Sequence, residues 1–421
     1  MQETTRPIDS RRALEALRSG VPNKDAVLAL GCDQPDVERR FLEQLNALDA
    51  ANGEPRHVPG LLVAGGFGTG KSHLLEYLEN MAVSSGFVCS RVVISKETPL
   101  FDAAKVFRAA IEAAIVPGRS GQAIHEVALG LNQKTPGYAD LFRWANSPES
   151  GIGSLFPATL MLHERLSQDP ELVEQICNFW AGDKLPIGGV KAGLRQIGQA
   201  ASYSVKPIKV KELARQRFLF AARLFRAAGF KGWTVLIDEV ELIGRYSLLQ
   251  RGRSYAELAT WLGRIESEGY PGLTAVAAIT DDFDLGVLQG KGDRDYVGPR
   301  LRAKETDEYT MLAARAEVGI RVIERESVLL HRPDDTARAA IRERLQHIHA
   351  TAYDWAPPGL PSHESKGGRP MRSYVRRWIN EWDLNRLYPG HVVNTEEEEL
   401  KTTYEENPQL EEPPEPEVGQ D

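Results

Sequence analysis

The chain has 421 residues, with 51 Lys or Arg and 59 Asp or Glu, so its formal net charge is −8. This length allows two or three domains with a substantial core and excludes a small scaffold stapled by disulfides or metals. The cysteines Cys32, Cys89 and Cys177 lie far apart without CxxC or CxxH spacing, which argues against disulfides and a zinc site. The N-terminus carries no apolar stretch of the signal-peptide kind, and no later segment approaches the length of a membrane span, so we expect a soluble, cytoplasmic protein without membrane contact.

The negative charge is concentrated at the C-terminus. Residues Thr395 to Asp421 include eleven acidic residues and one lysine, a net charge of −10. This tail is rich in Glu and Pro and is predicted to be disordered. Because the preceding residues are close to neutral as a whole, their surface is still able to hold local basic patches.

The first 50 residues are predicted to form helices, one from Ser10 to Gly20 and another from Pro35. The apolar segment 61–64 then reads as a strand that breaks into a glycine-rich turn and restarts as a helix at about Gly70. This context, together with Gly65, four intervening residues and Gly70-Lys71-Ser72, is typical of a phosphate-binding loop.

Each part of this loop has a separate task around a triphosphate. Its glycines bring backbone N–H groups close to the phosphates, and the helix start directs further N–H groups at the same anion. Lys71 is expected to reach the β- and γ-phosphates, and the Ser72 hydroxyl to ligate Mg²⁺. A glycine-rich hairpin, the alternative, requires neither the Lys-Ser pair nor the preceding strand. We therefore predict ATP and Mg²⁺ as ligands, with the nucleotide bound by Gly65, Gly66, Phe67, Gly68, Thr69, Gly70, Lys71, Ser72 and His73.

The remaining elements favour an α/β fold in which a parallel sheet is flanked by helices, as in P-loop NTPases. Further apolar strands are predicted at 87–94, 233–237, 273–279 and 327–330, with a helix from Asp102 to about Ala114 and a long one from Val210 to Ala228. Residues 117–205 read as a helical insertion. After Pro333 two helices, 334–353 and 370–387, are predicted to form a C-terminal lid. The predicted domains are 1–50 (N-terminal helices), 51–332 (ATPase core), 333–392 (lid) and 393–421 (tail).

The strand that ends at Ile237 is followed by Asp238 and Glu239. Asp238 is predicted to hold Mg²⁺ or its water, and Glu239 to orient and deprotonate an attacking water. The alternative is a strand that simply ends in acidic surface residues. This alternative is disfavoured because the same chain contains a phosphate-binding loop, the other half of a metal–triphosphate site. Thr280, at the end of the next strand, is predicted to contact the γ-phosphate or the lytic water; its other reading is a helix cap.

Charge develops on the transferred phosphoryl group, so a cation is expected to complete the site. Arg321 is the first candidate for a residue supplied by a neighbouring subunit, with Arg300 and Arg302 as alternatives. Arg372, in the lid, is the candidate for contact with the phosphates of its own subunit. Each of these arginines can equally be a solvated or helix-pairing charge.

Three groups of basic residues are candidates for contact with double-stranded DNA, although they also fit solvated helix faces. Trp378 and Trp382 are expected to be core anchors of the lid. The groups are Lys206, Lys209, Lys211, Arg215 and Arg217; Arg245, Arg251 and Arg253; and Arg369, Arg372, Arg376 and Arg377.

Three segments together resemble the ATP-binding family of BREX, the bacteriophage-exclusion defence systems, and especially its shorter members, BrxD. They are Gly65 to His73, Val92 to Leu100 and Leu236 to Glu241. The resemblance covers most of residues 8–390. It implies an AAA+-type (ORC-like) ATPase that acts with other BREX components, and it carries the phosphate-site roles to Lys71, Ser72, Asp238 and Glu239.

The leading functional prediction is an ATPase that assembles or remodels a defence complex on DNA, and we expect it to be a homo-oligomer. Two alternatives stay open: a nucleotide-dependent switch with little turnover, and a loader of a helicase or transposase. A helicase proper is disfavoured because a single P-loop core is visible. A kinase is disfavoured because the Asp-Glu pair suits the activation of water.

Overall fold

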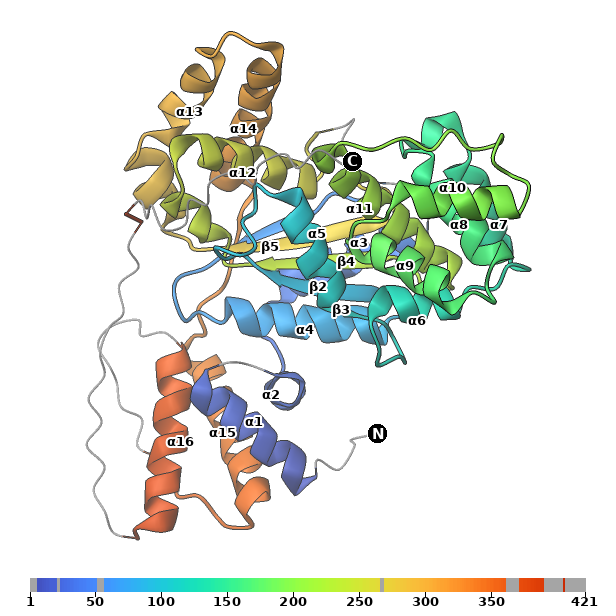
Figure 1. The fold of residues 1–421 in the computed structure, drawn as a ribbon. Coiled ribbons are helices and arrows are strands. Elements are labelled where there is room, and N and C mark those ends of the chain that lie inside the picture. The colour runs from blue at the N-terminus through green and yellow to red at the C-terminus, as the bar shows by residue number, and fades with distance from the viewer. Residues whose placement is uncertain are drawn as a thin grey trace.

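In the computed structural model, residues 6–20, 23–50, 57–265, 269–360, 371–389 and 404–405 are described. They form a six-stranded sheet with helices on both faces, a group of helices at one sheet edge and a separate helical unit beside the sheet (Figure 1). The strands are β1 (Leu61–Ala64), β2 (Val88–Val93), β3 (Ala114–Ile115), β4 (Trp233–Asp238), β5 (Leu273–Ile279) and β6 (Val328–Leu329). The predicted mixed α/β architecture is confirmed.

The strand order is β3-β2-β4-β5-β1-β6. All neighbouring pairs are parallel except β2 with β3, which is antiparallel. β3 lies where a helix end was predicted, so the sheet has one strand more than the sequence indicated. Two strands, β4 and β5, separate β1 from β2, although these two are consecutive in the predicted strand–helix–strand unit.

Successive side chains of a strand point to opposite faces of the sheet, so the buried apolar residues form one cluster on each face. Leu61 and Val63 of β1 belong to one apolar cluster, whereas Leu62 and Ala64 belong to the other. Helices α3 (Pro35–Asp49) and α4 (Lys71–Ser84) contribute to the first cluster. The second face is covered by α5 (Ala103–Glu112), α11 (Val210–Ala227) and α12 (Leu248–Trp261). Because both faces are covered, the inner strands are continuous apolar runs.

The segment between β3 and α11 is helical throughout its described elements, as predicted. Its helices lie at the β3 edge of the sheet (Figure 1) and pack on the second face through Phe156, Phe179 and Trp180. They are α6 (Ala123–Leu129), α7 (Pro136–Ala145), the 3₁₀ turn η1 (Pro148–Ser150), α8 (Leu155–Arg165), α9 (Pro170–Ala181) and α10 (Ile187–Gln196).

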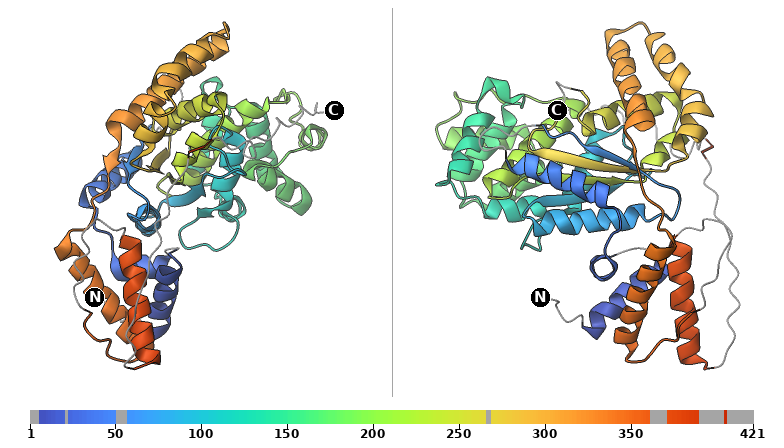
Figure 2. Two further views of the ribbon diagram at one scale, coloured as in Figure 1. Left: turned by 90° about the vertical axis from the view of Figure 1, so that its left-hand side faces the viewer. Right: turned by 180° about the vertical axis from the view of Figure 1, so that it is seen from behind.

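At the opposite end of the molecule, α13 (Asp293–Arg302) and α14 (Asp307–Glu326) form a hairpin that projects from the sheet domain in every view (Figures 1 and 2). Two short helices precede it, the 3₁₀ helix η2 (Val240–Arg245) after β4 and the π-helix η3 (Asp284–Gln289) after β5. In the described helices, none has the length and apolar character needed to cross a membrane.

The separate helical unit combines two helices from the N-terminal part of the chain with two that follow β6. It contains α1 (Pro7–Ser19) and α2 (Lys24–Leu30) together with α15 (Asp335–Tyr353) and α16 (Met371–Leu387), which share one apolar cluster (Figure 2). Trp378 and Trp382 are buried in this cluster, as predicted. The N-terminal segment predicted as one domain is therefore divided, since α1 and α2 pack with the lid and α3 packs on the sheet.

Candidate functional site

The glycine-rich loop connects the end of β1 to the start of α4. Gly68 and Gly70 have φ values of 74° and 102°, in the region that favours glycine. The loop closes on itself, because Thr69 Oγ1 donates to the carbonyl of Gly66 at 2.8 Å. The N–H of Gly65 donates to the carbonyl of Ile279 at 3.1 Å, which anchors the loop to the end of β5.

Helix α4 begins with Gly70 as its N-cap, and among the described residues no side chain caps its first turn. Unpaired N–H groups at such an end, with the positive end of the helix dipole, attract anions. No acidic residue stands in this first turn. The local geometry is therefore suited to a phosphate group.

Lys71 connects the loop to the segment after β4. Its Nζ donates to the carbonyl of Gly65 at 2.9 Å and lies 3.7 Å from Glu241 Oε1. Both side chains are buried. Burial raises the pKa of Glu241 to about 7 despite the attraction of Lys71, and its Oε2 is buried without a hydrogen-bond partner among the described residues.

Asp238 is held in place by an arginine of the neighbouring strand. Its Oδ2 accepts from Arg91 Nη2 at 2.9 Å, while Arg91 Nη1 donates to Glu76 of α4 at 3.1 Å. The other oxygen, Oδ1, accepts from the backbone N–H of Glu239 at 3.0 Å. Asp238 is 2 % exposed, so its carboxyl group is held in place and shielded from water at the C-terminal end of β4.

Glu239 has an unusual backbone, with φ 60° and ψ 33°. A non-glycine residue in this left-handed region costs on the order of 1 kcal/mol and is found preferentially at functional sites. The side chain is exposed, unlike that of Asp238. Partial burial and the adjacent Asp238 raise its pKa, against the attraction of Lys71. A carboxylate with a raised pKa is better matched to proton transfer near neutral pH.

Thr280 directly follows β5, which lies between β1 and β4. Because β1, β5 and β4 are parallel neighbours, Thr280 lies at the same end of the sheet as the phosphate loop and Asp238, where these strands terminate. The threonine is buried, and its Oγ1 lies 2.6 Å from the hydroxyl of Tyr404. The tail was expected to be disordered; apart from Tyr404 and Glu405, it lies outside the described residues.

One arginine lies beside the phosphate loop. A Cβ built on Gly66 would be 3.4 Å from Arg332 Nη2, and this guanidinium lies 4.0 Å from Asp281 Oδ2. Gln34 exchanges two hydrogen bonds of 2.9 Å with the backbone of His331, which holds the chain just before Arg332. Arg332 is largely exposed. The carboxylate of Asp281 lies as close to the position of that Cβ, at 3.4 and 3.5 Å, so an incoming anion would meet both a cation and an anion here.

The arginines predicted to complete the nucleotide site make their contacts elsewhere. Arg321 is exposed on α14. Arg302 forms two hydrogen bonds with Glu317, at 2.6 and 2.8 Å. Arg372 donates to the carbonyl of Ser19 at the end of α1, at 3.2 Å. Both Arg302 and Arg372 thus bond helices of their own chain in this conformation.

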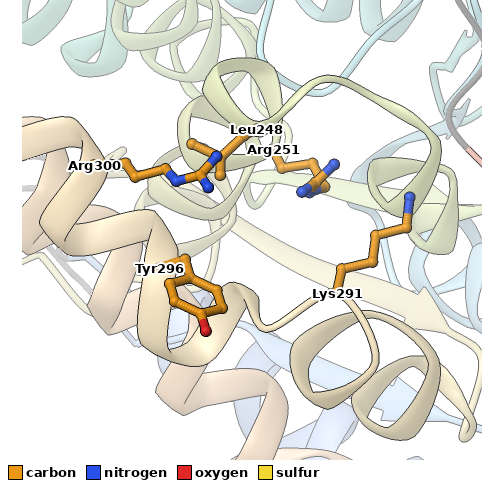
Figure 3. A pocket seen from close by; sticks show the side chains of 5 residues that line it. All are labelled: Leu248, Arg251, Lys291, Tyr296 and Arg300. Carbon is orange, nitrogen blue, oxygen red and sulfur yellow. The ribbon is translucent and has the colours of Figure 1, made fainter.

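Arg300 lines a cavity of 330 Å³ between α12 and α13, shown in Figure 3. The other lining residues are Leu248, Arg251, Lys291 and Tyr296. Arg251 is neutralised by buried Asp293, at 2.8 and 2.9 Å, and Lys291 donates to the carbonyl of Gly244 at 2.9 Å. The phosphate loop contributes no residue to this cavity.

His73 contacts the backbone that follows α2. Its Nε2 lies 2.8 Å from the carbonyl of Gly31, after α2, and burial lowers the pKa of the imidazole. Arg344 of α15 donates to the neighbouring carbonyl, that of Leu30. The helix that begins at the phosphate loop is thus connected to the lid unit through the end of α2.

Several residues of the basic groups have structural partners. Arg217 is buried and donates to the carbonyl of Asp183, and burial together with Arg108 lowers its pKa to about 10. Arg377 bonds Glu381 one helical turn away, at 2.6 Å. Arg217, Arg377 and Arg251 therefore form hydrogen bonds with groups of their own chain. Arg369 and the side chain of Lys211 lie outside the described residues.

The described residues include no group of three or more His, Cys, Asp or Glu side chains suited to hold a metal. Mg²⁺ is usually bound by one or two protein ligands together with substrate phosphates and water. The pair of Ser72 and Asp238 fits that mode in its chemistry, because it supplies one hydroxyl at the start of α4 and one carboxylate at the end of β4. It does not fit a cation bound by protein alone.

Four residues of this site were not predicted: Arg91, Glu241, Arg332 and Tyr404. The chain position of Arg332, just after the last strand, is a signal that could have found it, since strand ends meet at one sheet edge. Glu241 offered a similar signal, two residues after the acidic pair. The contacts of Arg91 and Tyr404 depend on neighbours far away in the chain.

Residues 6–128 match the family model described as BREX system ATP-binding protein BrxC/D. No curated protein and no solved structure matches the chain. The matched range holds α1 to α3, the phosphate loop, β2 and α5. Because the description covers both BrxC and BrxD, the assignment to the shorter members stays a prediction. Over residues 6–128 the chain is thus similar to the BREX system ATP-binding proteins BrxC/D, which confirms the family predicted from its sequence.

Proposed function

We propose that this protein is a Mg²⁺-dependent AAA+-type ATPase of a BREX anti-phage system, which assembles or remodels a DNA-associated complex. The family match supports an ATP-binding component of such a system. The observation that carries hydrolysis is the exposed carboxylate of Glu239, whose pKa is raised and which directly follows buried Asp238 at the end of β4. The contact of Lys71 with Glu241, at 3.7 Å, brings the segment after β4 to the glycine-rich loop, although about 170 residues separate the two in the chain.

In the proposed mechanism the loop amides and Lys71 bind the phosphates of ATP. Mg²⁺, held by Ser72 and Asp238, would neutralise charge on the β- and γ-phosphates. Glu239, exposed and with a raised pKa, orients a water and takes its proton. Thr280 positions the γ-phosphate or that water. Arg332, beside Gly66, is the cation that we assign to the phosphates within the subunit.

Single-turnover hydrolysis of ATP tests this proposal, with wild type, Lys71→Ala and Glu239→Gln, each with and without duplex DNA. We expect Lys71→Ala to lose nucleotide binding. Glu239→Gln should keep binding and lose hydrolysis by about 10²–10⁴-fold, the usual contribution of a general base. Equal, negligible rates in all samples would reject the hydrolytic function.

A second candidate function is a nucleotide-dependent switch with low turnover. It is favoured by the arrangement of the site, in which three proposed catalytic groups already have protein partners. Lys71 contacts Glu241, Asp238 bonds Arg91 and Thr280 contacts Tyr404. Slow hydrolysis that DNA and partner proteins leave unchanged, combined with tight ATP binding, would favour the switch.

We also propose that the protein is a homo-oligomer in which Arg321 of one subunit approaches the nucleotide of the next. Its support is the exposure of Arg321 on the projecting α13–α14 hairpin (Figure 2). Particle mass of Glu239→Gln with ATP, with and without DNA, measures this. A strictly monomeric particle would remove Arg321 from the site.

A further inference from the structure

We propose that a socket beside the nucleotide site, at the end of β5, binds the acidic C-terminal tail through Tyr404, and that the docked tail restrains ATP turnover. The second half of this inference rests on the proposed ATPase function. The first half, the docking itself, does not. The socket is formed by Thr280, Asp282, Phe283, Gly244 and Gly286.

The socket has the shape of a tyrosine ring. Phe283, itself fully buried, contacts the ring of Tyr404 edge-on, with centroids 6.0 Å apart and an interplanar angle of 87°. A Cβ built on Gly286 would lie 2.9 Å from two ring carbons of Tyr404, and the other near atom is also in this ring. A Cβ on Gly244 would meet Val287 Cγ2 at 2.7 Å and the ring at 2.9 Å. The absence of a side chain at Gly286 therefore makes the room that Tyr404 fills, and at Gly244 the ring shares this room with Val287.

The hydroxyl of Tyr404 is bound on both sides. It donates to Asp282 Oδ1 at 2.7 Å and lies 2.6 Å from Thr280 Oγ1. A phenol has one proton, and here Asp282 accepts it. Thr280 must therefore donate its own proton to the phenol oxygen. While the tail is docked, this proton is not available to a phosphate or a water.

This arrangement predicts competition for Thr280. In the proposed mechanism Thr280 positions the γ-phosphate or the lytic water, and it cannot do so while it donates to Tyr404. Docking should therefore lower turnover.

Docking can be tested without hydrolysis, by hydrogen exchange of the full chain in the absence of nucleotide. The variants are Tyr404→Phe, which removes both hydroxyl contacts, and Gly286→Ala, which fills the space of the ring. Their matched controls are Tyr388→Phe, an exposed tyrosine, and Gly189→Ala, whose Cβ would meet nothing within 4 Å. We expect faster exchange of residues 283–290 in both test variants alone. Exchange equal to that of wild type would refute docking.

Restraint is measured by single-turnover hydrolysis with the same four variants. Tyr404→Phe and Gly286→Ala should each raise the rate about tenfold, the effect of losing ~1.4 kcal/mol of docking free energy. In a Thr280→Val background this gain should vanish, because the hydroxyl that the tail restrains is absent. A purely structural tail would not produce this dependence on Thr280.

The outcomes distinguish the restraint by the docked tail from the proposed ATPase function. A lower rate in Tyr404→Phe would show that the phenol assists the reaction, and it would overturn the restraint. A gain that persists in the Thr280→Val background would also overturn it. Absence of hydrolysis in every sample would instead contradict the proposed function, and hydrogen exchange would still decide whether Tyr404 docks.

Discussion

At the scale of single residues, Glu241 is a carboxylate buried against the lysine of the phosphate loop. Burial raises its pKa to about 7, so it is ionised above that pH and neutral below it. The ionised form attracts Lys71, 3.7 Å away, and adds a negative charge beside the loop that we propose binds the phosphates. Protonation should therefore favour the nucleotide.

We predict that the Kd of wild type for ATP decreases about tenfold as the pH falls from 8 to 6. Glu241→Gln should bind tightly at pH 8 and lack the part of this trend that Glu241 contributes. Titration calorimetry at pH 6, 7 and 8 measures both proteins. Because the titration of ATP itself affects both alike, their difference isolates Glu241. Parallel pH curves would contradict the prediction.

Glu239 combines a strained backbone with a catalytic assignment. We predict that Glu239→Gly is more stable than Glu239→Gln by ~1 kcal/mol, because glycine relieves the φ of 60° and glutamine does not. Both variants should lose hydrolysis. Urea unfolding gives the free energies and single-turnover assays give the rates. A glycine variant less stable than the glutamine variant would show that the backbone is not strained.

The sequence predicted these residues with uneven success. It indicated the glycine loop, Lys71, Asp238, Glu239 and Thr280 because strand ends and helix starts are local patterns. It did not indicate that Arg91 holds Asp238 or that Tyr404 holds Thr280, since both contacts join residues more than 120 positions apart. Charge and polarity are visible in a sequence, but the partner that neutralises them is decided by packing.

At the scale of elements, α12 and α14 pack closely against each other at Gly319. A Cβ built on Gly319 of α14 would lie 2.0 Å from the carbonyl oxygen of Tyr255 in α12. This oxygen belongs to the backbone of a buried helix, so it cannot move aside easily. The two helices are held at a distance that only glycine permits.

Gly319→Ala is accordingly predicted to lower the free energy of unfolding by ~2 kcal/mol or more, although alanine favours helices by ~1 kcal/mol. The matched substitution Gly189→Ala, in open space on α10, should be neutral or stabilising. Urea unfolding of both variants measures the contrast. Equal effects at the two positions would mean that α12 and α14 are not in close contact.

The predicted elements agree with the structure where their signal is continuous. All five predicted strands and the long helix from Val210 are present, because each is an apolar or amphipathic run of clear period. β3 was missed because two residues are too few to form a pattern. The separation of β1 from β2 by two strands was not predicted, since pairing depends on contacts between distant segments.

At the scale of the whole molecule, Asp383 of α16 connects the first helix, α1, to the two helices α15 and α16 near the other end of the chain. It bonds Arg18 of α1 and lies 3.2 Å from Nε2 of His349, which is fully buried in α15. Trp355 Nε1 donates to His349 Nδ1 at 2.8 Å, so Nε2 carries the proton that Asp383 accepts. Burial would raise the pKa of Asp383, but the bonds from His349 and Arg18 outweigh it and lower this pKa.

We predict that Asp383→Asn lowers the free energy of unfolding by ~2 kcal/mol at pH 7, the worth of hydrogen bonds to a charged group. Since the folded pKa lies below the usual 3.8, this stability is present above about pH 4 and is lost as the pH falls through the folded value. The difference from wild type should therefore narrow below pH 4. Glu343→Gln, exposed on α15, serves as the control and should change little. Urea unfolding between pH 3 and pH 7 measures both.

By itself, the sequence predicted the class of fold, the glycine-rich loop before a helix and the strand that ends in an acidic pair, because these depend on local periodicity and spacing, and its resemblance to the BREX ATP-binding family agrees with the match over residues 6–128. Only the tertiary structure decided that β5 separates β1 from β4, that α1 and α2 belong with the lid, and that Tyr404 lies on Thr280. These features join segments up to 365 residues apart. They are selected by the burial of complementary surfaces, which no window of neighbouring residues contains.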